Sequence, residues 1–142
     1  MDRSTIVNKI KHSADKYGSS NPQQLEQLSL ICSKAPEREI FFGLFSFFCD
    51  ENLQNNQFQR QELAGKILLK ITPASSLELD ASVYASAQKW NRSIEELPWY
   101  WCNVFGTKEV INFLTNLIPS VEDKEIEENI NTMLFWCRNY KQ

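Results

Sequence analysis

Residues 40–49 read Ile-Phe-Phe-Gly-Leu-Phe-Ser-Phe-Phe-Cys and hold five of the nine phenylalanines of the chain. If this run is a helix, its only strip without large apolar side chains is formed by Glu39, Gly43, Ser46 and Asp50. A helix that is apolar on most sides has to be surrounded by other helices. A strand is the competing interpretation, because phenylalanine is a good strand former. The charged turn 37–39 directly after Pro36 favours a helix, which we expect to run to about residue 54.

The rest of the chain shows helical spacing on both sides of this run. Apolar residues recur every three to four positions, and only 4 Gly and 5 Pro interrupt the 142 residues. The remaining expected helices cover 4–17, 22–32, 57–71, 75–90, 93–105, 107–118 and 120–138. The sequence therefore predicts an all-α fold of about eight short helices in antiparallel hairpins around a central Phe-rich helix. A compact bundle and a short HEAT-like α-solenoid both fit, and we expect 1–142 to be a single domain.

Several polar residues stand where helices are expected to begin. Ser4 precedes the first apolar stripe, Ser75 with Glu78 and Ser93 with Glu96 have the spacing of capping boxes, and Thr107 and Ser120 precede the last two helices. Pro98 falls inside the sixth segment, so we expect that helix to restart or kink there.

Charge and cysteine usage narrow the class of protein. The formal net charge is −3, with a balance of +1 over residues 1–71 and −4 over residues 72–142, which disfavours general nucleic-acid binding. The N-terminus has no apolar signal segment, and the longest apolar run is about ten residues where a membrane span needs about 20. None of the four cysteines forms a C-x-x-C pair, and each lies among apolar residues. We interpret them as buried, reduced side chains of a cytoplasmic protein.

Residues that carry chemistry are scarce. The only histidine, His12, falls on the polar face of its helix, and one histidine cannot supply the paired ligands of a zinc site. Phosphate-binding glycine motifs and nucleophile elbows are absent from the sequence. Carboxylate pairs such as Glu95/Glu96 are common on helix surfaces. The sequence therefore indicates a protein that is not an enzyme and needs no metal or cofactor.

Three features exceed what folding requires. Trp99 and Tyr100 either pack on a neighbouring helix or form an exposed aromatic pair that anchors an interface. Phe135 lies opposite the apolar stripe of the last helix, where it is either sandwiched between layers or part of a contact patch. The third is an acidic run at the start of that helix, which either complements the helix dipole or steers a cationic partner. It consists of Glu122, Asp123, Glu125, Glu127 and Glu128.

The stretch Leu97-Pro98-Trp99-Tyr100-Trp101-Cys102-Asn103-Val104-Phe105-Gly106 and the overall character of the chain resemble HEAT-like helical proteins and the small immunity proteins with which bacteria neutralise toxins. The resemblance covers about half of the chain and implies a stoichiometric inhibitor of a cationic protein. The leading hypothesis is therefore a non-catalytic protein-binding module, with its partner contacts at the three features above. The alternatives are a helical scaffold or adaptor, a small-ligand carrier that uses the aromatic core, and a cryptic enzyme.

Overall fold

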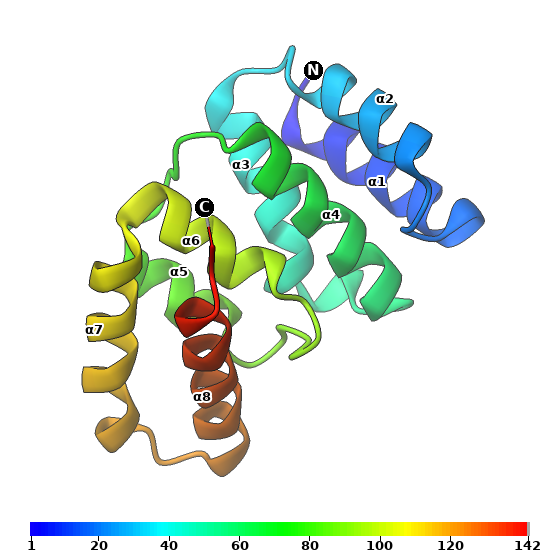
Figure 1. The fold of residues 1–142 in the computed structure, drawn as a ribbon. Coiled ribbons are helices and arrows are strands. Elements are labelled where there is room, and N and C mark those ends of the chain that lie inside the picture. The colour runs from blue at the N-terminus through cyan, green and yellow to red at the C-terminus, as the bar shows by residue number, and fades with distance from the viewer. Residues whose placement is uncertain (142) are drawn as a thin grey trace.

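Helix is the only regular secondary structure in residues 1–141, which are the residues that the computed structural model describes (Figure 1). The all-α prediction is confirmed. The α-helices are α1 (Arg3–Tyr17), α2 (Pro22–Cys32), α3 (Glu37–Phe45), α4 (Gln57–Ile71), α5 (Leu79–Ser86), α6 (Glu96–Phe105), α7 (Thr107–Leu117) and α8 (Lys124–Arg138). Three 3₁₀ turns, η1 (Ser46–Phe48), η2 (Glu51–Leu53) and η3 (Ile118–Ser120), complete the set.

Most of the phenylalanine run is buried, but it does not form one long helix. α3 ends at Phe45 and passes directly into η1. The Ser46 hydroxyl donates to the Gly43 carbonyl at 2.7 Å, and the Asp50 carboxylate accepts from the backbone N–H of Asn52 at 2.9 Å, which starts η2. The expected helix to residue 54 is wrong because these local bonds divert the backbone, and a uniformly apolar run gives no signal for where a helix tightens into a 3₁₀ turn.

The buried rings make the centre of the core. Phe41 stacks on Phe45 with a centroid distance of 5.3 Å, and Phe45 lies 6.4 Å from Phe48. Phe41, Phe47 and Phe48 have no exposed surface. α4 packs beside this cluster and also contacts α1, α2 and α6, so it joins the first half of the chain to the second.

Two glycines allow helices to approach closely. A Cβ on Gly43 would lie 2.9 Å from Cγ2 of Ile6, where α3 meets α1. A Cβ on Gly65 would lie 3.0 Å from Cβ of Glu96, where α4 meets α6. The absence of a side chain at these positions sets the spacing of two helix pairs, α1 with α3 and α4 with α6.

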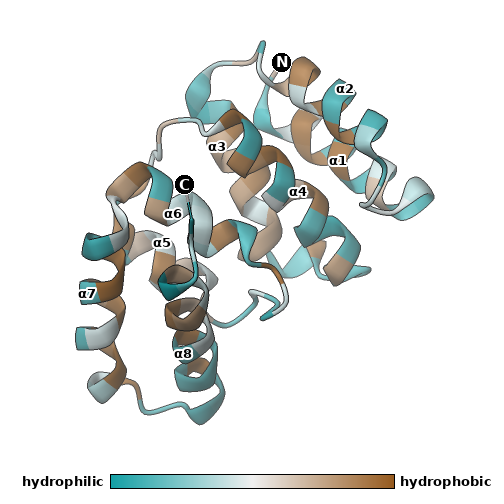
Figure 2. Ribbon diagram, in the orientation of Figure 1, coloured by the Kyte–Doolittle hydropathy of each residue, from teal (hydrophilic) through white to brown (hydrophobic). Residues whose placement is uncertain are grey.

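The second half of the chain is built from α5 to α8. α6 contacts α4, α7 and α8, and α7 packs along α8. Figure 2 shows hydrophobic residues on the side of α7 that faces α8, in agreement with the buried Val110 and Leu114. None of the helices of residues 1–141 has the length and hydropathy that crossing a membrane requires.

Most of the expected helix caps are wrong. Asp2, rather than Ser4, caps α1 by accepting from the backbone N–H of Thr5. Ser75 closes a local turn by donating to the Leu77 carbonyl, and Ser120 donates to the Leu117 carbonyl. The helices that Ser93 and Thr107 were expected to cap are preceded by Glu95 and Gly106 instead. Serine and threonine bond readily to nearby backbone in turns as well as at caps, so their spacing alone does not fix a helix start.

Pro98 is tolerated without a restart of α6. It is the third residue of that helix, where a backbone N–H has no partner within the helix. The missing donor of proline therefore costs nothing at this position.

Candidate protein interface

α6 separates Trp99 from Tyr100, which follow one another in sequence but face different surroundings. Tyr100 has no exposed surface, and its hydroxyl donates to the Pro73 carbonyl at 2.6 Å. Its ring lies 6.3 Å from that of Phe41, and burial raises the pKa of its hydroxyl. The expectation of an exposed Trp99–Tyr100 pair is therefore wrong for Tyr100. Successive residues on a helix are about 100° apart, so the two side chains were bound to diverge.

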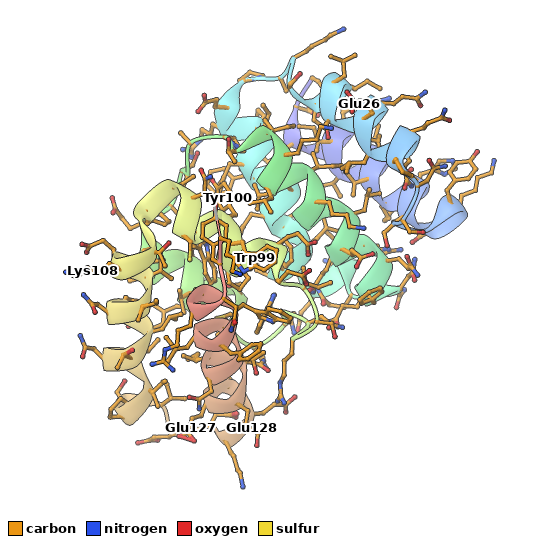
Figure 3. The ribbon with its side chains drawn as sticks, in the orientation of Figure 1. Glu26, Trp99, Tyr100, Lys108, Glu127 and Glu128 are labelled. Carbon is orange, nitrogen blue, oxygen red and sulfur yellow. The ribbon has the colours of Figure 1, made fainter. Side chains whose placement is uncertain are left out.

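Trp99 is half-buried and turns toward α8. Its indole Nε1 donates to the Trp136 carbonyl at 2.9 Å. The Trp99 ring meets that of Trp136 edge to face at 6.2 Å and lies 6.0 Å from that of Tyr140. Trp99 thus occupies the seam between α6 and the end of α8 (Figure 3).

Phe135 extends this seam to the surface. Its side chain is 54% exposed, and its ring meets that of Trp136 at 5.2 Å. The Trp136 indole donates to the Arg92 carbonyl at 2.9 Å. We refer to Trp99, Phe135, Trp136 and Tyr140 as the aromatic patch. The structure therefore brings together Trp99 and Phe135, two residues predicted to bind a partner. Trp136, which was not among the predicted residues, contacts both of them.

The indole N–H groups of the aromatic patch bond to backbone carbonyls of the protein itself. Both rings are thereby fixed in position, and the faces that remain uncovered are apolar. An aromatic surface held in this way loses little conformational freedom when it is covered by a partner. This is the property expected of an interface anchor.

The acidic run lies at the other end of α8. Glu122, Asp123, Glu125 and Glu128 are exposed, and Glu127 is half-buried. The Asp123 carboxylate caps α8 by accepting from the backbone N–H of Ile126 at 3.0 Å. Glu128 pairs with Arg92, with 3.0 Å between Oε2 and Nη2. No cation of residues 1–141 pairs with Glu122, Asp123, Glu125 or Glu127, and of these Glu122 and Glu125 are exposed and take no part in capping α8.

Arg92 connects the acidic run to the aromatic patch. Its guanidinium contacts Glu128 and the Asn129 side chain, while its carbonyl receives the Trp136 indole. Glu128 and Phe135 are seven residues apart on α8, which places them on the same side and about 10 Å apart along the axis. Glu128, the last residue of the acidic run, therefore lies on the same side of α8 as Phe135, and Arg92 links it to the aromatic patch.

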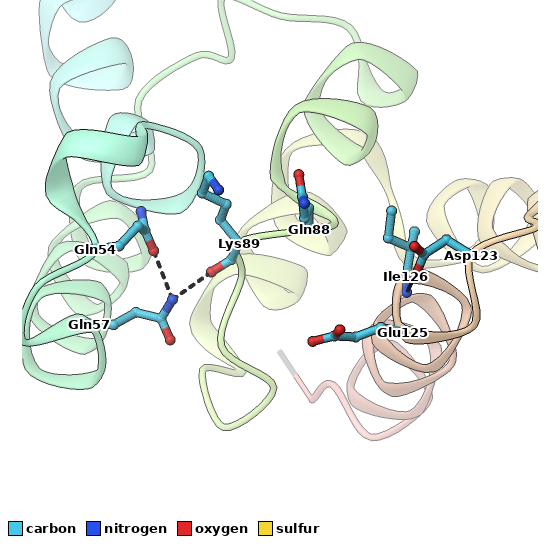
Figure 4. A pocket seen from close by; sticks show the side chains of 7 residues that line it. All are labelled: Gln54, Gln57, Gln88, Lys89, Asp123, Glu125 and Ile126. Carbon is cyan, nitrogen blue, oxygen red and sulfur yellow. Dashed lines mark hydrogen bonds between the residues drawn. The ribbon is translucent and has the colours of Figure 1, made fainter.

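A polar groove lies beside the acidic run (Figure 4). Its volume is about 340 Å³, and it separates the start of α4 from the start of α8. Gln57 donates from its amide to Gln54 and to the Lys89 carbonyl, which fixes one wall, while Glu125 faces the groove from the other. The lining residues are Gln54, Gln57, Gln88, Lys89, Asp123, Glu125 and Ile126. Sequence reasoning missed this groove because its walls come from three separate segments.

Residues 1–141 contain no group of three or more His, Cys, Asp or Glu side chains placed to hold a metal ion. His12 is exposed on α1. The Glu96 carboxyl is buried, and burial followed by repulsion from Glu95 raises its pKa to about 7. Glu96 packs against Gly65 of α4 and not in the polar groove, so it is not joined to a site there.

Comparisons with known proteins reveal no relative of this chain. Neither protein-family models, nor curated proteins, nor solved structures give a match to the chain.

Proposed function

We propose that the protein is a non-catalytic binding module that covers a cationic protein partner stoichiometrically, in the manner of an immunity or antitoxin protein. The observation that supports this most is that Glu128 of the acidic run lies on the same side of α8 as Phe135 and is joined to the aromatic patch through Arg92. Half-exposed aromatic side chains, held by their own hydrogen bonds, supply apolar contact area. The neighbouring carboxylates supply a negative field.

The two parts of this surface have different tasks. Phe135 and the uncovered edges of Trp99 and Trp136 provide the contact that sets the lifetime of the complex. Glu122 and Glu125, which have no cation partner among residues 1–141, attract a positive surface and accelerate encounter. Glu128 and Asp123 already serve the fold through Arg92 and the α8 cap, so their role in steering is smaller.

A small-ligand carrier is less well supported. That hypothesis requires space among Phe41, Phe45, Phe48 and Trp90, which are 0–3% exposed. The rings of Phe41, Phe45 and Phe48 lie at ordinary stacking distances, so this part of the core is occupied by its own side chains. The polar groove is the more spacious hollow, but its walls are amides and charges rather than apolar groups.

A site-specific photo-crosslinking experiment tests the proposed surface. A benzophenone amino acid replaces Phe135 in one variant and Tyr17 in the control, since both side chains are large, aromatic and more than half exposed. Crosslinking is carried out in cells of the native host. We expect one basic protein to be captured from position 135 and not from position 17. Equal capture from both positions, or capture of acidic proteins only, would contradict the proposal.

The captured protein is then purified and titrated with the chain. A 1:1 endpoint is expected, and Glu122→Gln with Glu125→Gln should lower the association rate about 10-fold at low salt and much less at high salt. An association rate that is the same at both salt concentrations would remove the steering role. A partner that is neutral in charge would instead favour the scaffold or adaptor alternative.

A further inference from the structure

Two of the four cysteines lie together beneath the aromatic patch. Cys102 is in α6 and Cys137 is in the last turn of α8, and they are 1% and 0% exposed. Three contacts fix the alignment of these helices around the pair. The Cys137 Sγ lies 4.0 Å from the Pro98 carbonyl oxygen, the Trp99 indole bonds to the Trp136 carbonyl, and the Asn103 amide reaches the Tyr140 hydroxyl at 3.4 Å.

The geometry places the two thiols side by side, because the Pro98 carbonyl that Cys137 reaches lies one helical turn before Cys102 on α6. A hydrogen bond from Cys137, and a weaker one from Thr107, lower the pKa of Cys102, whereas the same thiol–thiol bond and burial raise that of Cys137. Cys102 is therefore the member of the pair that ionises first. A thiolate next to a second thiol is the arrangement in which a cysteine is attacked by an oxidant and then resolved by its neighbour.

The other two cysteines differ in their surroundings. Cys32 lies in α2, and burial raises its pKa to about 11. Cys49 follows η1 and directs its thiol at the Phe45 carbonyl. Cys32 and Cys49 lie in separate elements, away from the seam between α6 and α8, so they serve as internal controls.

We propose that Cys102 and Cys137 are a redox-sensitive pair whose oxidation joins α6 to α8 by a disulfide bond. Hydrogen peroxide, a small neutral oxidant, is the co-reactant. The Cys102 thiolate attacks one peroxide oxygen, breaks the O–O bond and becomes a sulfenic acid, and the hydroxide released takes up a proton to leave as water. The Cys137 sulfur then attacks the Cys102 sulfur, and the hydroxyl leaves as a second water with the proton of Cys137. Two thiols are oxidised by two electrons and one peroxide is reduced.

The position of Cys137 gives the oxidant access to a buried pair. It is the residue before the last of α8, and helix ends fray more readily than helix centres. The disulfide would close a loop that contains all of α7 and most of α8, which restricts the unfolded chain. It would also hold Trp136, next to Cys137, against Trp99 and so fix the aromatic patch. This inference does not depend on the proposed function.

Mass spectrometry of the full-length chain tests the proposal. The reduced protein and a Cys32→Ser, Cys49→Ser variant are exposed to hydrogen peroxide under native conditions, denatured, alkylated and mapped. We expect each to lose about 2 Da, the mass of two hydrogen atoms, with Cys102 and Cys137 protected from alkylation and found in one crosslinked peptide. The oxidised form should have a Tm about 5–10 °C higher than the reduced form.

The control variant is Cys137→Ser. It leaves Cys102 without a resolving thiol, so we expect no intramolecular crosslink and instead a gain of about 16 Da from a sulfenic acid at Cys102. Oxidation of the double-serine variant that adds oxygen without forming the crosslink would overturn the proposal. A crosslink through Cys32 or Cys49, a disulfide between two copies of the chain, or a lower Tm after crosslinking would overturn it as well.

Discussion

The protein contains two aromatic clusters of similar chemistry that have opposite relations to solvent. The first, made of Phe41, Phe45, Phe47 and Phe48 in α3 and η1, consists of rings without polar atoms and is sealed from water. The second, the aromatic patch, is rich in indole N–H groups, bonds them to its own backbone and leaves Phe135 54% exposed. α6 lies between them, with Tyr100 facing the first and Trp99 joining the second. The comparison teaches that aromatic content alone does not separate core from interface. What separates them is whether the surrounding helices close over the rings.

The largest expected effect concerns the sealed cluster. Phe45→Ala removes a ring that stacks on Phe41 and is 2% exposed. We expect a loss of about 3–5 kcal/mol in the free energy of unfolding, because the cavity cannot fill without moving α3 or α4. Urea denaturation followed by circular dichroism measures this loss. A loss below about 1 kcal/mol in the free energy of unfolding would mean that the first cluster is packed no more tightly than the aromatic patch.

The buried carboxyl of Glu96 on α6 leads to a second prediction, which concerns how the stability of the fold depends on pH. The pKa of Glu96 is raised from 4.5 to about 7, first by burial and then by Glu95, and one of its carboxylate oxygens has no partner. Between pH 4.5 and 7 the folded state retains a proton that the unfolded state releases, so stability falls as the pH rises and the full penalty is present above pH 7.

Glu96→Gln should therefore be more stable than the natural protein at pH 8, by up to about 3 kcal/mol, and nearly equal to it at pH 4.5. Urea denaturation at both pH values gives the difference. Glu109→Gln, at an exposed carboxylate of α7, is the matched control and should show no comparable pH dependence. A Glu96→Gln variant that is less stable at pH 8 would show that the carboxylate is solvated when folded.

Adjacent positions of α6 offer the sharpest test of the comparison. Tyr100→Phe leaves the buried Pro73 carbonyl without its donor and should cost about 1–2 kcal/mol. Trp99→Phe also removes a donor, from the Trp136 carbonyl, but the site is half-exposed, so water replaces the bond and the cost should be smaller. Thermal unfolding of both variants measures the order. The reverse order would place Trp99 on the core side of α6.

The smallest expected effect on folding lies at the edge of the aromatic patch. Phe135→Ala should change the free energy of unfolding by no more than about 0.5 kcal/mol, because the side chain is more exposed than buried. Under the proposed function, the same change should raise the dissociation rate of the partner complex at least about 10-fold. Tyr17→Ala, at a comparably exposed ring of α1, is the control and should change neither quantity.

The presence and order of the helices could be predicted from the sequence, but the residues at which they end and the exposure of individual side chains could not. The spacing of Ile126, Ile130 and Cys137 predicts α8, and these apolar residues do lie on its inner side or in contact with the core. The end of α3 depends on the bond from Ser46 to Gly43, which an apolar run does not encode. The burial of Tyr100 depends on α3 and on the Pro73 carbonyl, both distant in sequence. The polar groove depends on the approach of α4 and α8, which no local sequence pattern predicts.

The division of the tryptophans gives the protein a built-in optical reporter. Trp90 and Trp101 are 3% and 0% exposed, whereas Trp99 and Trp136 are half-buried and meet edge to face. Acrylamide should therefore quench the fluorescence of the second pair selectively, and a bound protein should protect exactly that fraction of the emission. Coupling between the two neighbouring indoles should also give a paired signal in the ultraviolet circular dichroism spectrum. Loss of that signal would report movement of the end of α8, without a label and without unfolding the chain.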